Sequence, residues 1–229
     1  NGMLDRLQAS DRAQRRFVAD ASHELRSPLA TLAATIDVAA SDASGSTWPD
    51  VAPVLRSQSA RMGRLVEDLL ILAKVDDAGL GLRRVDTDLD EVVREEVARM
   101  RPASRHEVHV RVDPVRIRGD AGRLQQVLRN LLSNAERHAQ SWIAVSVRAD
   151  GEHAVVTVDN DGGVIAPEDR ERVFERFVRL DDSRARDTGG SGLGLAISRE
   201  IVVAHEGTIT AGEDPRGHCR FEVRLPRER

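Results

Sequence analysis

The sequence predicts an α+β protein in two parts: a helical hairpin that pairs into a dimeric four-helix bundle, followed by an α/β sandwich. Two observations favour this fold class. Apolar residues recur at alternating spacings of three and four along the first part, as they do in helices packed in a bundle. Helical and strand-like patterns alternate in the second part, which is typical of a layered domain. We expect the hairpin over residues 11–77, a hinge over 78–82 and the layered domain over 83–229.

The composition limits the classes of function. The chain has 229 residues, 40% of them hydrophobic, and a formal net charge of -4. Because no basic tract is interleaved with aromatic residues, we expect no nucleic-acid partner. Cys219 is the only cysteine, which excludes an internal disulfide and favours a reducing compartment. No apolar run approaches the roughly 20 residues of a membrane span and no signal peptide opens the sequence, so we expect this portion to be soluble and cytoplasmic.

The first predicted helix carries a histidine outside its apolar stripe. His23 lies about 200° from Ala21 and about 160° from Leu25 around the helix, so its imidazole should point into solvent. Glu24 can hold one ring nitrogen and leave the other nucleophilic, although such a pair alone more often marks a solvated polar face. Pro28 gives no N–H to the carbonyl of Glu24, so we expect a kink or local loosening there. The stripe comprises Leu4, Leu7, Val18, Ala21, Leu25, Leu29, Leu32 and Ile36.

A second helix is expected after a turn at residues 41–50, where Ser, Asp, Gly and Pro gather. Its own apolar stripe comprises Val51, Leu55, Met62, Leu65, Leu69 and Leu72. Because a hairpin of two helices cannot bury both stripes, we expect a homodimer.

The second part is expected to alternate helices and mostly antiparallel strands. Helices are predicted over residues 88–100, 120–139 and 191–205, the second of them capped by Asp120. Strands are predicted from residue 106, in a hairpin over 143–149 and 153–159, and over 208–210 and 220–225.

Polar residues gather at three places in this second part. Asn130, Asn134 and Arg137 share one face of a helix, with His138 beside them. Amide oxygens suit Mg²⁺ and a guanidinium suits phosphate, although Asn at this spacing also fits a solvated face. The charged stretch 180–189 has almost no apolar anchor and is predicted to be a mobile lid. After it, Gly190, Ser191, Gly192, Leu193 and Gly194 open a helix whose N–H groups can face phosphate.

Five segments resemble motifs of the sensor histidine kinases of two-component systems. FVADASHELRSPL (17–29) resembles the histidine box, and LVEDLLILAKVDD (65–77) resembles the second helix of the kinase hairpin. LRNLLSNAERHA (128–139) is similar to the asparagine box. VDNDGGVIAPEDRERVFERFVRL (158–180) is similar to the first glycine box and the phenylalanine box, and GGSGLGLAI (189–197) to the second glycine box. The resemblance covers nearly the whole chain and implies a Bergerat-type ATP-binding domain.

The resemblance implies a role for individual residues. His23 would receive phosphate from ATP, Glu24 would orient its imidazole and take its proton, and Asn134 would bind Mg²⁺. Ser27 stands one helical turn after the histidine, where family members often carry Thr or Asn for dephosphorylating the regulator. Nucleotide contacts are implied for Asn130, Asn134, Arg137, His138, Asn160 or Asp161, Gly162, Arg179, Gly190, Ser191, Gly192, Leu193 and Gly194.

Two positions depart from the family pattern. Asn160 stands where the family has an Asp that accepts from the adenine amino group, so either Asn160 or its neighbour Asp161 could meet adenine. Val164 stands where the family has glycine. If its backbone must be left-handed, Val164 carries about 1–3 kcal/mol of strain; the alternative is that Gly163 has taken over the turn.

The resemblance implies ATP-dependent autophosphorylation of His23, phosphotransfer to an aspartate of a cognate response regulator, and phosphatase activity. Residues 1–10 resemble the end of a HAMP-type signalling helix, so the full-length protein is expected to be a membrane-anchored sensor with this portion in the cytoplasm. The alternatives are an ATPase of the same Bergerat family and a dimeric scaffold with a degenerate nucleotide site.

Overall fold

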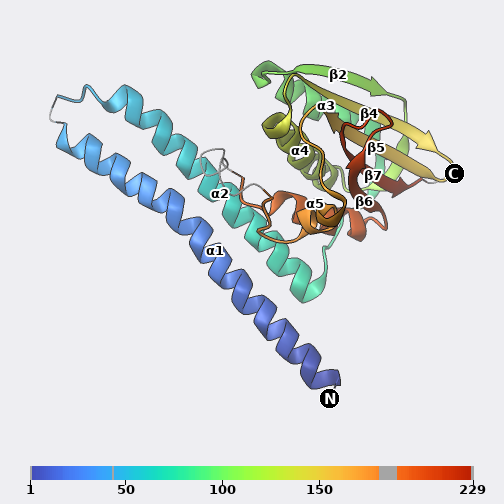
Figure 1. The fold of residues 1–229 in the computed structure, drawn as a ribbon, viewed down its shortest axis with the longest axis horizontal. Coiled ribbons are helices and arrows are strands. Elements are labelled where there is room, and N and C mark those ends of the chain that lie inside the picture. The colour runs from blue at the N-terminus through green and yellow to red at the C-terminus, as the bar shows by residue number, and fades with distance from the viewer. Residues whose placement is uncertain (1, 43, 181–189, 228–229) are drawn as a thin grey trace. The chain divides into compact units, whose positions relative to one another are not determined.

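The computed structural model describes residues 2–42, 44–180 and 190–227. The chain forms two compact units, Asn1–Ala73 and Lys74–Arg229, which we treat separately. Figure 1 shows their elements, a helical hairpin followed by a mixed sheet with helices. The α+β class and the order of the two parts are therefore confirmed. The division between the units falls inside helix α2 (Trp48–Ala78), and residues 79–84 after it have no regular structure.

The hairpin consists of α1 (Gly2–Ser41) and α2. Helix α1 continues as one helix through Pro28, whose side chain is buried. The carboxylate of Asp42 holds the turn between the helices, because it accepts hydrogen bonds from the N–H groups of Ser44 (3.0 Å) and Thr47 (2.7 Å). The second helix thus begins at Trp48, three residues earlier than the apolar stripe predicts.

The apolar stripe of α1 divides into two faces. Ala21 is buried at 8% exposure, whereas Val18, Leu29 and Ile36 are 53–57% exposed. The three exposed residues are spaced by eleven and seven, which places them within about 20° of one another around the helix. The side chains of Leu4 and Leu7 lie outside the described part of the structure. The hairpin therefore presents a continuous apolar face to solvent in a single copy of the chain.

The second unit is built on a five-stranded sheet in the order β2-β4-β5-β7-β6. Strands β2 and β4 pair in parallel, and the remaining neighbours are antiparallel. The strands are β2 (Glu107–Val112), β4 (Trp142–Asp150), β5 (His153–Asn160), β6 (Thr208–Glu213) and β7 (Cys219–Pro226). The helices are α3 (Leu89–Met100), α4 (Ala121–His138) and α5 (Gly194–Ala204).

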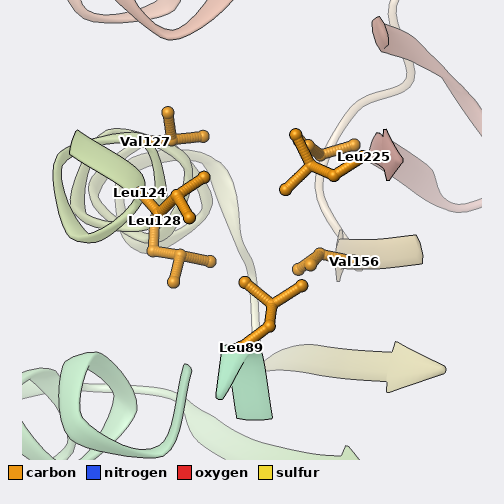
Figure 2. A pocket seen from close by; sticks show the side chains of 7 residues that line it. Leu89, Leu124, Val127, Leu128, Val156 and Leu225 are labelled. Atoms are coloured by element: carbon orange, nitrogen blue, oxygen red, sulfur yellow. The ribbon is translucent and has the colours of Figure 1, made fainter. Parts of the chain in front are cut away.

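The apolar core lies between α4 and one face of this sheet. Leu124 and Leu128 of α4 point toward Val156 of β5 and Leu225 of β7, with Leu89 at the start of α3 closing the same pocket (Figure 2). All five side chains are at most 3% exposed. The amphipathic pattern of α4 thus fixes which of its faces is left for polar residues.

The structure adds elements that the sequence pattern did not predict. A two-stranded antiparallel sheet joins β1 (Val85–Asp88) to β3 (Arg116–Gly119). Two 3₁₀ turns, Pro167–Asp169 and Arg172–Phe174, follow β5, and a third such turn spans Arg101–Ala103. Residues 181–189, most of the predicted lid, lie outside the described residues. Within the described ranges, no helix has the length and apolar character that crossing a bilayer requires.

Candidate active site

His23 is an exposed side chain on α1. The carboxylate of the adjacent Glu24 is half-buried and faces the other helix, where its Oε2 lies 3.8 Å from Nη2 of Arg61. Successive helical residues point about 100° apart, so Glu24 and His23 leave the helix in different directions, and the contact with Arg61 restricts where the Glu24 carboxylate can lie. No pattern in the sequence indicates Arg61, because only the pairing of the two helices brings it to Glu24.

Ser27 also lies on the exposed surface of α1. Its carbonyl accepts a hydrogen bond from the Thr31 hydroxyl at 3.2 Å. Ser27 is one turn beyond His23, so both side chains lie on the same side of the helix within reach of one partner.

Helix α4 presents the predicted polar face. Asp120 caps it, since its Oδ1 accepts from the N–H of Arg123 at 3.2 Å. The Asn130 amide donates to the carbonyl of Gly194 at 2.8 Å, which ties α4 to the start of α5. Asn134 is half-exposed, and its amide has no hydrogen-bond partner among the described residues. Asn130 is thus fixed by the protein, whereas Asn134 is available to a ligand.

Arg137 and Arg179 place two positive charges near one another. Partial desolvation of the Arg137 guanidinium lowers its pKa, and the nearby cation of Arg179 lowers it further. Arg137 remains exposed and stays charged at neutral pH, because an arginine pKa lies far above it. Two neighbouring cations repel each other unless an anion lies between them, so this pair suits a polyphosphate.

The turn after β5 requires glycine at position 162. A β-carbon at Gly162 would lie 2.1 Å from the carbonyl oxygen of His138 and 2.7 Å from Nδ2 of Asn160. No side chain fits there, because real contacts of a β-carbon are longer than 3.0 Å. The end of α4, the end of β5 and the glycine turn therefore meet at one place.

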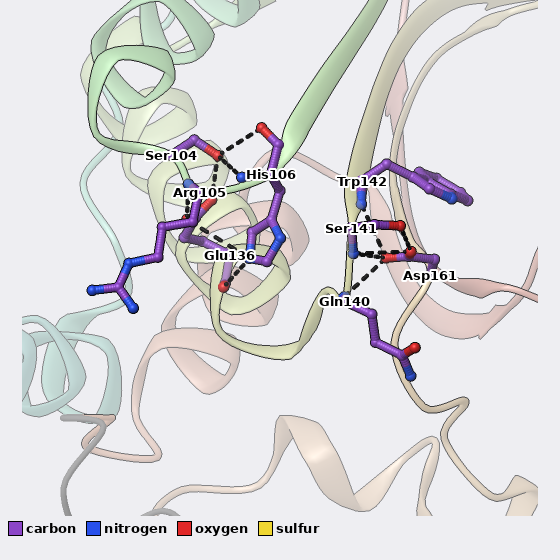
Figure 3. A network of polar contacts seen from close by, with 8 residues as sticks. All are labelled: Ser104, Arg105, His106, Glu136, Gln140, Ser141, Trp142 and Asp161. Carbon is purple, nitrogen blue, oxygen red and sulfur yellow. Dashed lines mark hydrogen bonds and ion pairs between the residues drawn. The ribbon is translucent and has the colours of Figure 1, made fainter.

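Asn160 and Asp161 have different environments. Asn160 is 1% exposed, and its Nδ2 is buried without a hydrogen bond to any described residue. Asp161 instead accepts from the N–H groups of Gln140 (2.9 Å), Ser141 (3.0 Å) and Trp142 (3.1 Å), as Figure 3 shows. Partial burial acts to raise the pKa of Asp161, but these hydrogen bonds and the Ser141 hydroxyl hold it well below its usual range.

A second network fixes the same end of α4. The Glu136 carboxylate accepts from the Ser104 hydroxyl at 2.7 Å and from the N–H of Arg105 at 3.0 Å (Figure 3). Nε2 of His106 lies 3.1 Å from the carbonyl oxygen of Glu136. Together with Asp161, these contacts hold the last turn of α4 and the segment after it in place.

The second glycine segment lies against α4 and against the segment after Phe174. A β-carbon at Gly190 would lie 3.2 Å from the Arg137 guanidinium, and one at Gly194 would lie 3.3 Å from the Asn130 side chain. Gly192 has a φ of +69°, and a β-carbon there would lie 2.8 Å from the backbone of Phe177. Phe177 itself has a φ of 63°, a rare left-handed conformation for a bulky residue, and its N–H donates to the carbonyl of Gly192 at 2.9 Å.

Other residues of these segments have packing roles. Leu193 is fully buried at the N-terminus of α5, and its N–H donates to the Ser191 hydroxyl at 3.3 Å. The strain considered for Val164 is absent, because Val164 is 49% exposed and not among the described non-glycine residues with a positive φ. Phe177 instead carries the left-handed backbone, and no pattern in the sequence indicated it.

Two domain families match most of the chain. Residues 13–78 match the "His Kinase A (phospho-acceptor) domain" family. Residues 119–229 match the "Histidine kinase-, DNA gyrase B-, and HSP90-like ATPase" family. The first match contains His23. The second contains the polar residues of α4, the end of β5 and both glycine segments.

Known proteins agree with these matches. The chain is 40% identical over 99% of its length to the probable sensor histidine kinase TcrY of Mycobacterium tuberculosis, of which it covers 50%. It is 30% identical to the solved mycobacterial sensor histidine kinase MprB, covering 64% of this chain and 99% of that one with a TM-score of 0.56. The histidine kinase AdeS of Acinetobacter baumannii shares the fold at 23% identity, with a TM-score of 0.72 over 90% of this chain and 98% of that one. The chain spans about half the length of the curated relatives it matches.

Proposed function

This chain belongs to the sensor histidine kinases, and on that premise we propose that it transfers the γ-phosphoryl group of ATP to His23 and from there to an aspartate of a response regulator. One observation carries the proposal. The same chain presents an exposed histidine on a phospho-acceptor hairpin and a cluster of polar and glycine residues where α4, β5 and α5 meet. An ATPase without a phospho-acceptor is not favoured, because residues 13–78 match the acceptor domain.

The triphosphate of ATP is proposed to lie against Arg137, Arg179 and the glycine segment that begins at Gly190. The two cations and the N–H groups at the start of α5 offer positive charge to the phosphate oxygens. Gly192 allows close approach of the backbone, because a side chain there would collide with the backbone of Phe177, and a side chain at Gly190 would crowd the Arg137 guanidinium. Asn130 supports this arrangement by joining α4 to Gly194.

Asn134 is proposed as the protein ligand of Mg²⁺. Its amide is unpaired, and within the described ranges no three His, Cys, Asp or Glu side chains gather as metal ligands. This donor set fits an ion that prefers oxygen and takes most of its ligands from phosphates and water. When bound, Mg²⁺ neutralises charge on the phosphates.

In the proposed chemical step, the lone pair of one imidazole nitrogen of neutral His23 forms a bond to the γ-phosphorus. The bond from the γ-phosphorus to the β,γ-bridging oxygen breaks in line, and ADP leaves with that electron pair. The proton on the other ring nitrogen passes to the carboxylate of Glu24. Arg61 restricts the positions of the Glu24 carboxylate through their ion pair, so we assign it a positioning role.

The hairpin is proposed to dimerise through the exposed apolar face of Val18, Leu29 and Ile36, and to dock the regulator around His23. The Ser27 hydroxyl is proposed to position water for hydrolysis of the regulator's phosphoaspartate. The full-length protein is proposed to be a membrane-anchored sensor with residues 1–10 as the end of a HAMP-type helix. This extension is supported by the resemblance of residues 1–10 to such a helix and by the greater length of the sensor kinases that the chain matches.

The proposed function is tested with γ-labelled ATP and Mg²⁺. We expect the chain to take up label that is stable in base and lost in acid, and to pass it to a response regulator. His23→Gln should reduce the label at least about a hundredfold without changing ATP binding, because the imidazole is exposed and supports no packing. Ser27→Ala is the matched control and should keep the label. Acid-labile label retained by His23→Gln would contradict the assignment.

A further inference from the structure

The segment that follows β5 has a strained backbone at Phe177. Phe177 has a φ of 63°, in the left-handed region that bulky residues rarely occupy. This region is unfavourable for any residue with a β-carbon, because that carbon comes too close to the following carbonyl oxygen. Such a conformation persists only where the surrounding structure holds it, and strained residues of this kind gather at functional sites. The backbone of Phe177 is therefore a candidate for a functional role.

The chain just before Phe177 is anchored to the core. The side chain of Phe174 is 5% exposed and packs edge-on against Phe221 of β7, with their ring centroids 6.1 Å apart. The guanidinium carbon of Arg199 on α5 lies 5.9 Å from the centroid of the same Phe174 ring. Because Phe174 is fixed between the sheet and α5, the direction of the chain beyond it depends on the few residues that lead to Phe177.

The left-handed conformation brings the backbone of Phe177 into direct contact with Gly192. The N–H of Phe177 donates to the carbonyl of Gly192 at 2.9 Å. A β-carbon at Gly192 would lie 2.8 Å from both Cα and the carbonyl carbon of Phe177, so the two backbones pack without any intervening side chain. An ordinary negative φ at Phe177 would redirect the chain on one side of this contact and separate the two backbones.

The contact supports the glycine segment at a third point. Leu193 is fully buried, and the carbonyl of Gly194 accepts a hydrogen bond from helix α4 at 2.8 Å. Phe177 adds the hydrogen bond to Gly192. Arg179, one of the two cations proposed to hold the triphosphate, follows Phe177 by two residues. The backbone conformation at Phe177 therefore affects both the glycine segment and the position of Arg179.

We propose that Phe177 is a positioning residue of the nucleotide site, and that ATP binding requires its left-handed backbone rather than its aromatic ring. The half-buried ring holds the backbone in this conformation, and the backbone in turn holds Gly192 where the phosphates approach. The inference rests on the proposed function in one respect, the placement of the triphosphate beside the glycine segment. It goes further in assigning a role to a residue that would not itself touch the nucleotide.

The test separates the ring from the backbone by comparing Phe177→Ala with Phe177→Gly. Both variants lack the ring, but glycine adopts left-handed backbone freely and alanine does not. The Kd of a non-hydrolysable ATP analogue is measured by calorimetry in Mg²⁺ on the whole chain. Phe177→Ala should bind at least about fivefold more weakly than Phe177→Gly, because only the alanine variant must return to a strained backbone on binding. A smaller ratio of the two Kd values would overturn the inference.

Glu206 provides the matched control. It is the other described non-glycine residue with a positive φ, at 62°, and it follows the end of α5 opposite the glycine segment. Glu206→Gly should resist urea better than Glu206→Ala, since glycine removes the same kind of strain. Their Kd values for the analogue should be equal. A Kd ratio at position 206 as large as that at position 177 would show that overall stability governs nucleotide binding, and would also overturn the inference.

A second pair of variants, Phe177→Asn and Phe177→Val, makes the same comparison if the alanine variant does not fold. Asparagine tolerates the left-handed region, whereas β-branched valine does not, so Phe177→Asn should bind the analogue more tightly. Equal or weaker binding by Phe177→Asn would overturn the inference. Failure of the wild-type chain to bind the analogue in Mg²⁺ would instead contradict the proposed function, and this inference with it.

Discussion

The hairpin and the sheet-based unit prepare their functional residues in opposite ways. On the hairpin, His23 is exposed and has no partner among the described residues, and apolar residues such as Leu29 and Ile36 are also exposed. In the second unit, Asn130 and Asp161 are fixed by hydrogen bonds, and the core beneath them is closed. We therefore propose that the hairpin presents a reactive group and pairs with a second copy, whereas the second unit is preorganised to bind a ligand.

The strongest test of this contrast concerns the one asparagine of α4 that the protein leaves unpaired. Asn134→Ala should weaken Mg²⁺-dependent ATP binding by about a hundredfold, because it removes the proposed protein ligand of the ion. Calorimetry with and without Mg²⁺ measures the effect. Ser133→Ala changes the neighbouring exposed residue of the same helix and should bind normally. Equal affinity of Asn134→Ala and the wild type in Mg²⁺ would remove the proposed metal site.

The second test concerns the exposed apolar face of the hairpin, which is proposed to form the dimer interface. Ile36→Asp should weaken the dimer by more than about tenfold, because burying an unpaired carboxylate in an apolar interface is costly. Val203→Asp is the control, since Val203 is 56% exposed on α5 against 53% for Ile36 on α1. Analytical ultracentrifugation should show monomers only for the hairpin variant. A dimer that tolerates Ile36→Asp and not Val203→Asp would place the interface on the second unit.

Substitution of Arg61 tests whether the hairpin, like the second unit, holds a functional side chain in position. Arg61→Met should lower the autophosphorylation rate at saturating ATP by about threefold to tenfold, because Glu24 loses the cation that positions it. The effect is modest since a partly exposed ion pair at 3.8 Å is weak. The Kd of ATP should not change, and Arg61→Lys should restore part of the rate. Arg64→Met removes an arginine of the same helix that is not part of the ion pair, and it should leave the autophosphorylation rate unchanged. A rate loss in Arg64→Met equal to that in Arg61→Met would rule out a specific role for the pair.

The smallest expected effect is a pH dependence confined to the second unit. His205 is 5% exposed, and its burial lowers its pKa. The cation of Arg84 also lowers this pKa, whereas the carbonyl of Ile201 and the carboxylate of Asp120 act to raise it. Its Nε2 accepts from the N–H of Asp120 at 2.9 Å, which requires the neutral ring.

Below the ordinary histidine pKa of about 6.5, the unfolded chain therefore binds more protons than the folded chain. The free energy of unfolding consequently falls as the pH drops. Urea unfolding at pH 7 and pH 5.5, followed on the second unit, should show this loss, and His205→Gln should show less of it. An equal loss in the variant would mean that other groups cause the dependence.

The sequence predicted the parts of the molecule that follow a regular pattern. The apolar spacing of α4, its cap at Asp120 and the shared face of Asn130 and Asn134 are all confirmed. Strands β1 and β3 were missed because charged residues such as Asp86 and Arg118 dominate them and give no apolar alternation. The contact of Arg61 with Glu24 depends on the pairing of two helices, and no local pattern encodes it. The different environments of Asn160 and Asp161 depend on backbone hydrogen bonds that only the folded loop makes, so the sequence could not distinguish the two residues.

The central claim is that His23 is the residue that accepts phosphate. The most direct measurement is peptide mapping by mass spectrometry at alkaline pH, after incubation with ATP and Mg²⁺. Trypsin releases the peptide of residues 17–26, which contains His23 and Ser22 but not Ser27. We expect one phosphate on His23 that is lost on brief treatment with acid. An acid-stable phosphate on Ser22 or Ser27, or phosphate confined to peptides of the second unit, would contradict the account.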